Sequence, residues 1–347
     1  MTKGSPFWAP EIHADRRAIL LDRVAITRAL RDYFTELGFI EVETAIMQVS
    51  PGNETHVHAF KTELSQPPRR DRRFLRCSPE FACKKLMAAG ERRVVEFAKV
   101  FRNGERGPLH HPEFTMIEWY RAHGRYELMM EDALGVIARA AETVETRLFS
   151  YRGLDADPCA PPERFTVAEA FERFANINLD EALPPDGPPD RDRFRLAAYD
   201  AGVRIAADDT WRDVFSRVLS EKIEPHLGVG QPTILDEYPT LMSALARPVE
   251  ADPRFAERFE IYVCGVELAN GFGELRDPRE QRRRLAEEMA EKERIYHERY
   301  PIDDDFIAAL HVMPETSGVA LGLDRLVMLA TGAQHIEQVM WAPVAEL

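Results

Sequence analysis

The sequence predicts an α+β fold in which helices flank an antiparallel sheet. Strand-forming segments cluster between helical ones, and few alternate with helices in the βαβ order that a parallel sheet needs. With 347 residues, 45% hydrophobic and 30% charged, the chain can bury a sizeable core. Its length allows one large domain or two smaller ones. We expect a single domain over residues 1–347, with a mostly helical, proline-rich insertion at about 150–230.

The first elements are a helix and a strand. Residues 18–37 repeat apolar side chains at helical spacing and stop at Gly38, which predicts one amphipathic helix. Residues 39–50 alternate apolar and polar side chains, which predicts a strand. Residues 66–74, QPPRRDRRF, read as an exposed hairpin loop or, alternatively, as a patch that docks anions.

The middle of the chain predicts a hairpin with a long polar tip. Residues 73–90 suit a strand, a Ser-Pro helix start and a helix that stops at glycine. Residues 94–103 and 113–122 have the β propensity of two strands joined by a loop containing glycine and proline. Residues 127–148 then predict an amphipathic helix.

The C-terminal part predicts strands at 232–239 and 258–272, a charged helix at 277–296, and a strand that runs into a helix at 317–332. A turn at Cys264 and Gly265 would divide the second strand into a hairpin. Residues 280–294 are expected to form a solvated helix face with ion pairs between successive turns.

Charge and cysteine content argue against several classes of protein. The 45 basic and 59 acidic residues give a net charge of −14, which opposes broad binding to nucleic acid. Four cysteines without a CxxC pair predict buried free thiols in a reducing compartment. The N-terminus resembles no export signal and no run of eighteen apolar residues occurs, so we expect a cytoplasmic protein without a membrane partner.

Three constellations could carry chemistry on a nucleotide triphosphate. The hairpin at 101–120, FRNGERGPLHHPEFTMIEWY, offers Arg102, His110 and Phe114, a cationic and aromatic set that suits phosphates and a base. Glu260 and Glu267 could hold Mg²⁺ if a turn brings them together. The third, GVALGLDR, allows close backbone approach and includes Arg325 near a helix start. Taken singly, surface charge or packing explains each of them, and His56 and His58 lack a third metal ligand nearby.

Together, in this order, the segments resemble the three signatures of class II aminoacyl-tRNA synthetases. GFIEVETAIM with the helix before it is similar to the first, dimer-forming signature, residues 101–120 to the second, and GVALGLDRLVML to the third. SPE at 78–80 and ELANGFGEL at 267–275 are similar to motifs of the lysine subgroup. Because the first helix begins within twenty residues of Met1, we expect no anticodon-binding domain and no tRNA partner. Such a chain resembles the elongation factor P (R)-β-lysine ligases, truncated paralogues of lysyl-tRNA synthetase.

The resemblance implies an AMP-forming ligase that uses ATP and Mg²⁺. Its partners would be (R)-β-lysine, a lysine of elongation factor P as acceptor, and a second copy of the chain in a homodimer. Two alternatives stay open: the same activation with tRNA or a small amine as acceptor, and a non-catalytic regulatory subunit. The presence of Arg102, Glu260, Glu267 and Arg325 opposes the second alternative.

The resemblance also implies roles for individual residues. Arg102 would contact the α-phosphate, His110 and Arg325 the β- and γ-phosphates, and Phe114 would stack on adenine. The other implied nucleotide-site residues are Asn103, Glu105, His111, Glu267, Leu268 and Gly322, and the implied metal ligands are Glu260 and Glu267.

For the amino acid, the resemblance implies that Glu274 and the Tyr120 hydroxyl bind the side-chain ammonium. Ala320 stands where the lysine enzymes have glycine, and its methyl would favour the β-amino isomer. The other implied residues of this subsite are Ser78, Pro79, Glu80, Glu118, Asn270 and Phe272.

The chain departs from the family pattern at three positions. Ala45 stands where the first signature usually has proline. Gly104, which precedes Glu105, stands where the second signature usually has an acidic residue, and His111 stands where it usually has asparagine. These departures concern the dimer contact and adenine recognition rather than the fold.

Overall fold

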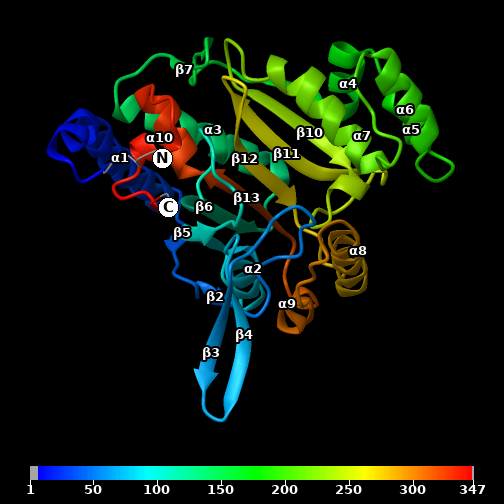
Figure 1. Cartoon of the computed structure of the whole chain (residues 1–347), viewed down its shortest axis with the longest axis horizontal. Coiled ribbons are helices and arrows are strands. Elements are labelled where there is room, and N and C mark those ends of the chain that lie inside the picture. The colour runs from blue at the N-terminus through cyan, green and yellow to red at the C-terminus, as the bar shows by residue number, and fades with distance from the viewer. Residues whose placement is uncertain (1–6, 346–347) are drawn as a thin grey trace.

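An eight-stranded sheet forms the centre of the molecule (Figure 1). The computed structural model describes residues 7–345. In spatial order the strands are β1 (Ile40–Glu41), β5 (Arg93–Phe101), β6 (Glu113–Ala122), β13 (Thr316–Gly322), β12 (Val266–Gly273), β11 (Phe255–Val263), β10 (Thr233–Pro239) and β9 (Glu163–Thr166). Neighbours from β5 to β10 are antiparallel, and only the edge strands β1 and β9 pair in parallel. The predicted α+β class is therefore confirmed.

Helices cover both faces of this sheet. On β6, Ile117 and Trp119 belong to the core beneath α1 (Pro10–Glu36), α3 (Tyr126–Thr143) and α10 (Leu323–Thr331). Tyr120 points to the opposite face, because side chains alternate along a strand. There it joins the core of α2 (Glu80–Ala88), α8 (Pro278–Tyr296) and α9 (Asp304–Leu310).

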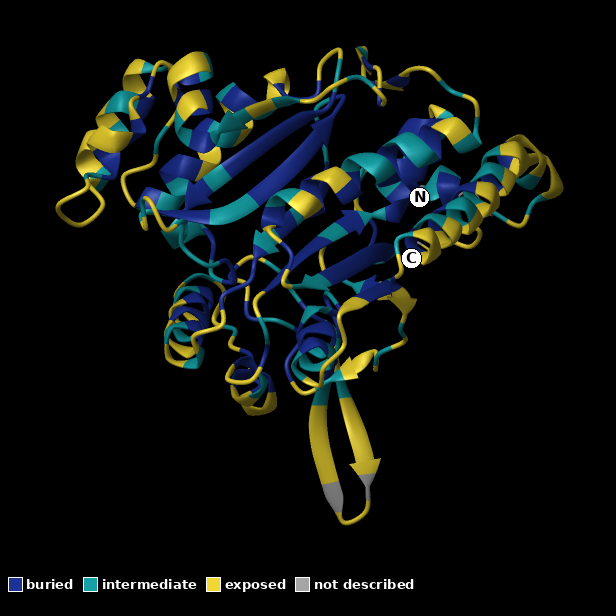
Figure 2. Ribbon diagram, turned by 180° about the vertical axis from the view of Figure 1, so that it is seen from behind, coloured by how far each residue is buried: buried dark blue, intermediate teal, exposed yellow. Residues whose placement is uncertain are grey.

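Two small sheets lie outside the central one. The strands β3 (Lys61–Gln66) and β4 (Arg69–Leu75), joined by β2 (Met47–Gln48), form a hairpin that projects from the body and is largely exposed (Figures 1 and 2). The strands β7 (Phe149–Tyr151) and β8 (Leu154–Ala156) form the other. The predicted loop at 66–74 is wrong, because only residues 67–68 form the turn and the arginines belong to β4.

Between β9 and β10 the chain is mostly helical. Its α helices are α4 (Val167–Ala175), α5 (Leu179–Ala182), α6 (Arg191–Asp200) and α7 (Trp211–Val218). They pack on β10 and β11 around a second core, in which the rings of Phe171, Phe194, Trp211 and Phe215 stack or tilt against one another. The division of the chain into domains stays a prediction.

Several sequence-based element boundaries need correction. The first helix begins at Pro10, since proline suits the first helical turn and Glu11 favours the helix dipole there. The predicted strand at 39–50 is wrong: its residues split into β1 and β2, which join different sheets. The short elements β7, β8, β9 and α9 were missed.

Two predictions about side chains also fail in part. The cysteines are free, but Cys159 is exposed rather than buried. The charged helix α8 forms the expected ion pairs, such as Arg283 with Glu287, yet Arg284, Glu288 and Lys292 on its inner face are buried. No helix within residues 7–345 is long and apolar enough to cross a membrane.

Candidate active site

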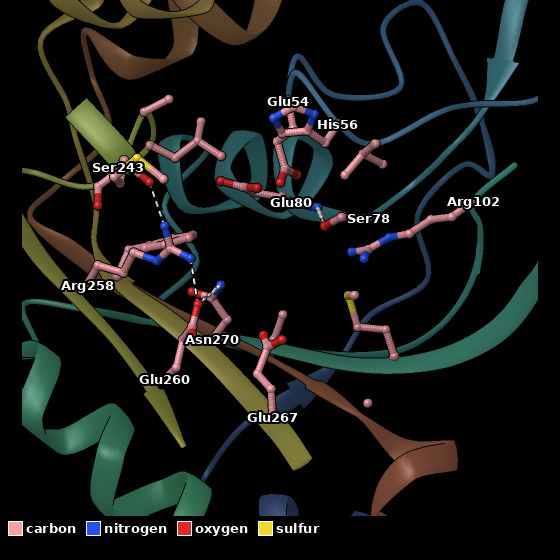
Figure 3. Close-up of a pocket in the computed structure, with 18 of the residues that line it drawn as sticks. Glu54, His56, Ser78, Glu80, Arg102, Ser243, Arg258, Glu260, Glu267 and Asn270 are labelled. Atoms are coloured by element: carbon pink, nitrogen blue, oxygen red, sulfur yellow. Dashed lines mark hydrogen bonds and ion pairs between the residues drawn. The ribbon is translucent and has the colours of Figure 1, made fainter. Parts of the chain in front are cut away.

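A cavity of about 450 Å³ opens above the central strands. Its floor comes from β6, β11, β12 and β13, and its walls from α2, α7, α8, the β5–β6 loop and the segment before β3 (Figure 3). Even-numbered residues such as Glu118, Glu260, Asn270 and Ala320 reach it from the four strands, because strand alternation and register place them on one face.

A β-bulge brings Glu267 to the same face as Glu260. The chain turns at Cys264 and Gly265, both with positive φ, as the hairpin alternative required. On β12 the register then shifts, so that Ala269 pairs with Ile261 and Glu267 with Tyr262. The extra residue reverses the alternation and turns the Glu267 side chain toward the cavity.

One end of the cavity is acidic. Glu80, Glu118 and Glu274 line it, and Lys84 is fully buried behind them. The Lys84 ammonium pairs with Glu274 at 2.5 Å and also with Glu80. Tyr120 Oη donates a hydrogen bond to Glu118 Oε1 at 2.5 Å. Two of the three carboxylates thus share one ammonium, Glu118 accepts only from hydroxyls, and Glu274 already has a cationic partner within the chain.

Burial sets the protonation of this end. It raises the pKa of Glu118 to about 8, and the neighbouring charge of Glu80 adds to the rise, while bonds from Tyr120 and Ser78 oppose it. Burial also raises the pKa of Glu274 above its ordinary value, against the effect of Lys84. For Lys84, burial alone would lower the pKa, but Glu274 and Glu80 outweigh it and raise the pKa.

The opposite end carries cations. Arg325 Nη2 donates to His110 Nε2 at 2.8 Å, and its Nη1 donates to the Glu267 carbonyl at 2.8 Å. Burial and the charge of Arg325 lower the pKa of His110, which suits a neutral acceptor. The Arg102 guanidinium lies 5.4 Å from the centre of the Phe114 ring, and no hydrogen bond satisfies its Nε in the described chain.

Glu260 is held by four donors at the β10–β11 side of the floor. Tyr238 and Tyr262 donate to Oε2, each at 2.6 Å. Arg258 and Asn270 donate to Oε1, at 2.6 and 3.3 Å. Burial raises the pKa of Glu267 to about 7, and the charge of Glu260 adds to the rise. The two acids therefore share one face, although among residues 7–345 no cluster of three potential metal ligands occurs.

Most of the sequence-predicted residues line this cavity. Pro79 instead precedes α2 as its N-cap, and Asn103 lies in the exposed part of the β5–β6 loop. His111 lines the cavity but is buried, where its Nδ1 bonds to the Glu113 carbonyl at 2.6 Å. The predicted residues that line the cavity are Ser78, Glu80, Arg102, Glu105, His110, His111, Phe114, Glu118, Tyr120, Glu260, Glu267, Leu268, Asn270, Phe272, Glu274, Ala320, Gly322 and Arg325.

Sequence reasoning missed several charged residues in or behind the cavity wall, Arg258, Lys84, Glu54 and Arg212 among them. Arg258 could have been found two positions before Glu260 on the same strand face, and Lys84 one helical turn after Glu80. Glu54 and Arg212 carry no comparable signal, because they belong to a loop and to the helical segment before β10.

Comparisons with known proteins identify relatives along nearly the whole chain. The family model for class II tRNA synthetases (D, K and N) matches residues 12–346. The chain is 36% identical to an elongation factor P–(R)-β-lysine ligase of Vibrio cholerae, over 93% of this chain and 94% of that protein. A ligase of the same name from Salmonella arizonae is also 36% identical, over 92% and 93%. The lysine–tRNA ligase of Moorella thermoacetica is 33% identical, over 96% of this chain and 66% of that protein.

Proposed function

From the premise that the chain belongs to the class II tRNA synthetases of the D, K and N type, we propose that it activates (R)-β-lysine with ATP. The product would be an aminoacyl-adenylate, whose aminoacyl group is then transferred to a lysine side chain of elongation factor P. The relatives that match along nearly their whole length carry the name of that reaction, and they support this choice of acceptor.

The charge pattern of the cavity is the observation that supports a diamino acid. With Glu80, Glu118 and Glu274 ionised, Lys84 leaves two negative charges without a partner. The two ammonium groups of a lysine isomer would neutralise both. A monoamino acid would leave one buried carboxylate without a counter-charge, which is costly.

Activation needs alignment and charge stabilisation more than proton transfer. The carboxylate of the amino acid is already ionised at pH 7 and attacks the α-phosphate directly. Arg102 would stabilise the charge that develops there, while Arg325 and His110 hold the outer phosphates. Losing such a donor costs on the order of 10²-fold or more in rate.

The acidic pair on the floor suits Mg²⁺. Glu267 faces the cavity, and its raised pKa reflects burial and repulsion from Glu260, both of which a divalent cation would relieve. Glu260 accepts four hydrogen bonds, so Glu267 is the better candidate for direct contact. Bound there, Mg²⁺ would offset the negative charge of the phosphates.

We propose that Ala320 distinguishes the two lysine isomers. On β13 it pairs with Asn270 of β12 and with Glu118 of β6, so its methyl lies between two residues of the amino-acid subsite. We expect this methyl to narrow the space for an α-amino group and to favour the β-amino isomer.

Pyrophosphate exchange with ATP and Mg²⁺ tests the proposal. Purified protein should support exchange with (R)-β-lysine, less with α-lysine and none without an amino acid, and Ala320→Gly should shift the preference toward α-lysine. Radiolabelled β-lysine should then appear on elongation factor P rather than on tRNA. If neither isomer supported exchange, the proposal would be overturned. Labelling of tRNA would show that tRNA, and not elongation factor P, is the acceptor.

A further inference from the structure

Glu54 carries a carboxylate that points into the cavity without a partner from the protein (Figure 3). Within residues 7–345 it makes no hydrogen bond or ion pair. Its neighbours are anchored: Asn53 Nδ2 donates to the Pro301 carbonyl at 3.2 Å, and the Thr55 backbone N–H donates to Glu288 at 3.2 Å. Asn53 and Thr55 are buried. The chain thus presents Glu54 at a fixed place on the cavity wall.

Its charged neighbours locate Glu54 between the two ends of the cavity. They are Arg102 at the proposed α-phosphate site, Glu80 at the amino-acid end, Arg258 on the floor and Glu288 on α8. The carbonyl carbon of an aminoacyl-adenylate joins the amino acid to the α-phosphate. This carbonyl carbon would therefore lie in the part of the cavity next to Glu54.

We infer that Glu54 is the general base that accepts the proton of the acceptor amine in the transfer step. This inference rests on the proposed function. It names a proton acceptor for the transfer step, whereas the activation step requires none.

With Glu54 as the base, every bond and proton of the transfer step is accounted for. The acceptor lysine reaches the site as a neutral amine, having lost its first proton to solvent. Its nitrogen forms a bond to the carbonyl carbon, and the bond from that carbon to the phosphate oxygen breaks, so that AMP leaves with the electron pair. The nitrogen then carries one proton too many for an amide. Glu54 accepts that proton and passes it to water at the open side of the cavity.

The other groups nearby are engaged. His56 Nδ1 is hydrogen-bonded to Tyr296 Oη at 2.9 Å. Glu288 accepts from Thr55 and pairs with Arg212 at 2.5 Å, and Glu291 pairs with Arg294 at 2.5 Å. The surrounding cavity walls raise the pKa of Glu54 by desolvation, with Arg102 acting in the opposite direction, while the side chain remains open to solvent. A carboxylate with a raised pKa is a stronger base than an ordinary surface glutamate.

Separating the two half-reactions tests the inference. The wild type must first show β-lysine-dependent exchange, since its absence would remove the proposed function itself. Glu54→Gln should then keep exchange near the wild-type rate while kcat for transfer to the acceptor protein falls about 10²-fold or more. KM for the acceptor should stay nearly constant, which distinguishes a base from a docking contact.

Two further readouts address the proton directly. In the wild type the transfer rate should fall as the pH drops through the raised pKa of Glu54, because the protonated carboxyl cannot accept a proton from the amine. The pH–rate profile of Glu54→Gln should lack this fall. Arg102, Glu80, Arg258, Glu288 and His56 surround the group and remain in the variant. Hydroxylamine, a strong nucleophile with little need of a base, should be acylated by Glu54→Gln nearly as fast as by the wild type.

Matched variants decide the outcome. Glu291→Gln removes an equal charge from the cavity rim and should leave the transfer rate and pH profile unchanged. Glu54→Asp should recover part of the rate. Normal transfer by Glu54→Gln, or an equal loss in Glu291→Gln, would overturn the inference. A loss confined to His56→Asn would move the role to the imidazole.

Discussion

At the scale of single residues, the buried Lys84 sets the charge that a substrate meets. Its ammonium lies on the inner face of α2, one turn after Glu80 and against Glu274. Removing one partner of a buried ion pair is costly, because the other charge remains without solvent or counter-ion. The carboxylates of the acidic end are therefore available to bind cations, and the binding of a cationic substrate is coupled to their protonation.

Binding of a diamino acid should release protons. Glu118, with a pKa of about 8, is largely protonated at about pH 6 and must ionise to pair with an ammonium group. Affinity should thus rise as the pH increases toward about 8. Titration calorimetry in two buffers with different ionisation enthalpies measures the released protons directly, and Glu118→Gln should reduce that number. A binding enthalpy independent of the buffer would contradict this assignment.

A methyl group at Gly318 should damage the amino-acid subsite selectively. Its Cβ would collide with the ring of Tyr120 and lie 2.8 Å from Glu274 Oε1. Overpacking of this kind costs about 1–3 kcal/mol. We expect Gly318→Ala to raise KM for the amino acid about tenfold or more, since about 1.4 kcal/mol is a factor of ten. KM for ATP should change much less, and an equal rise in both would point to general misfolding.

The sequence could identify individual site residues only where the residue type suits a ligand on its own. Arg102, Glu267 and Arg325 follow from the chemistry of phosphates and metals, and the structure brings them to one cavity. Lys84 looks like an ordinary helix charge until its burial is known. Glu54 belongs to a loop whose path only the whole fold determines.

At the scale of elements, Glu288 connects three parts of the cavity wall. It lies on α8, accepts from the Thr55 backbone in the segment before β3, and pairs with Arg212 of α7. The helical segment between β9 and β10 is thereby tied to the strand of chain that presents Glu54. Loss of the carboxylate would leave Arg212 and the Thr55 N–H without their partner.

Glu288→Ala should loosen this wall. Leaving buried donors unsatisfied costs about 1–3 kcal/mol, so the free energy of unfolding should fall by a similar amount. Hydrogen exchange should accelerate over residues 54–58 and in α7. Glu287→Ala on the same helix is the control, because Glu287 is exposed and its pair with Arg283 is worth about 0–1 kcal/mol. Equal effects of both variants would refute the role given to Glu288.

Predictability differed among the elements for physical reasons. Long periodic segments such as α8, β5 and β6 were identified correctly, because their pattern repeats over many residues. The two-residue strands β1 and β2 are too short to carry a pattern, and their pairing partners lie far along the chain. The bulge at Leu268 depends on the register between β11 and β12, which sequence alternation alone does not reveal.

At the scale of the whole molecule, the net charge of −14 coexists with cations that line the cavity. Arg102, Arg258 and Arg325 are among them, each beside an aromatic ring or a glutamate. The fold thus places individual cations among the carboxylates of an acidic chain. Composition alone argued against broad binding to nucleic acid, but it could not reveal where a polyphosphate would be held.

Exposed apolar side chains on α1 and the segment after it fit a homodimer interface. Leu21, Val24, Ile40, Ile46, Met47 and Val49 are each between 38% and 56% exposed. Burying such side chains against a second copy would be favourable. We expect the wild type to sediment as a dimer and Ile46→Asp to sediment as a monomer, because a charge in an apolar interface is costly. Leu196→Asp, on α6 and 62% exposed, should remain dimeric. A monomeric wild type at the same concentration would contradict the interface.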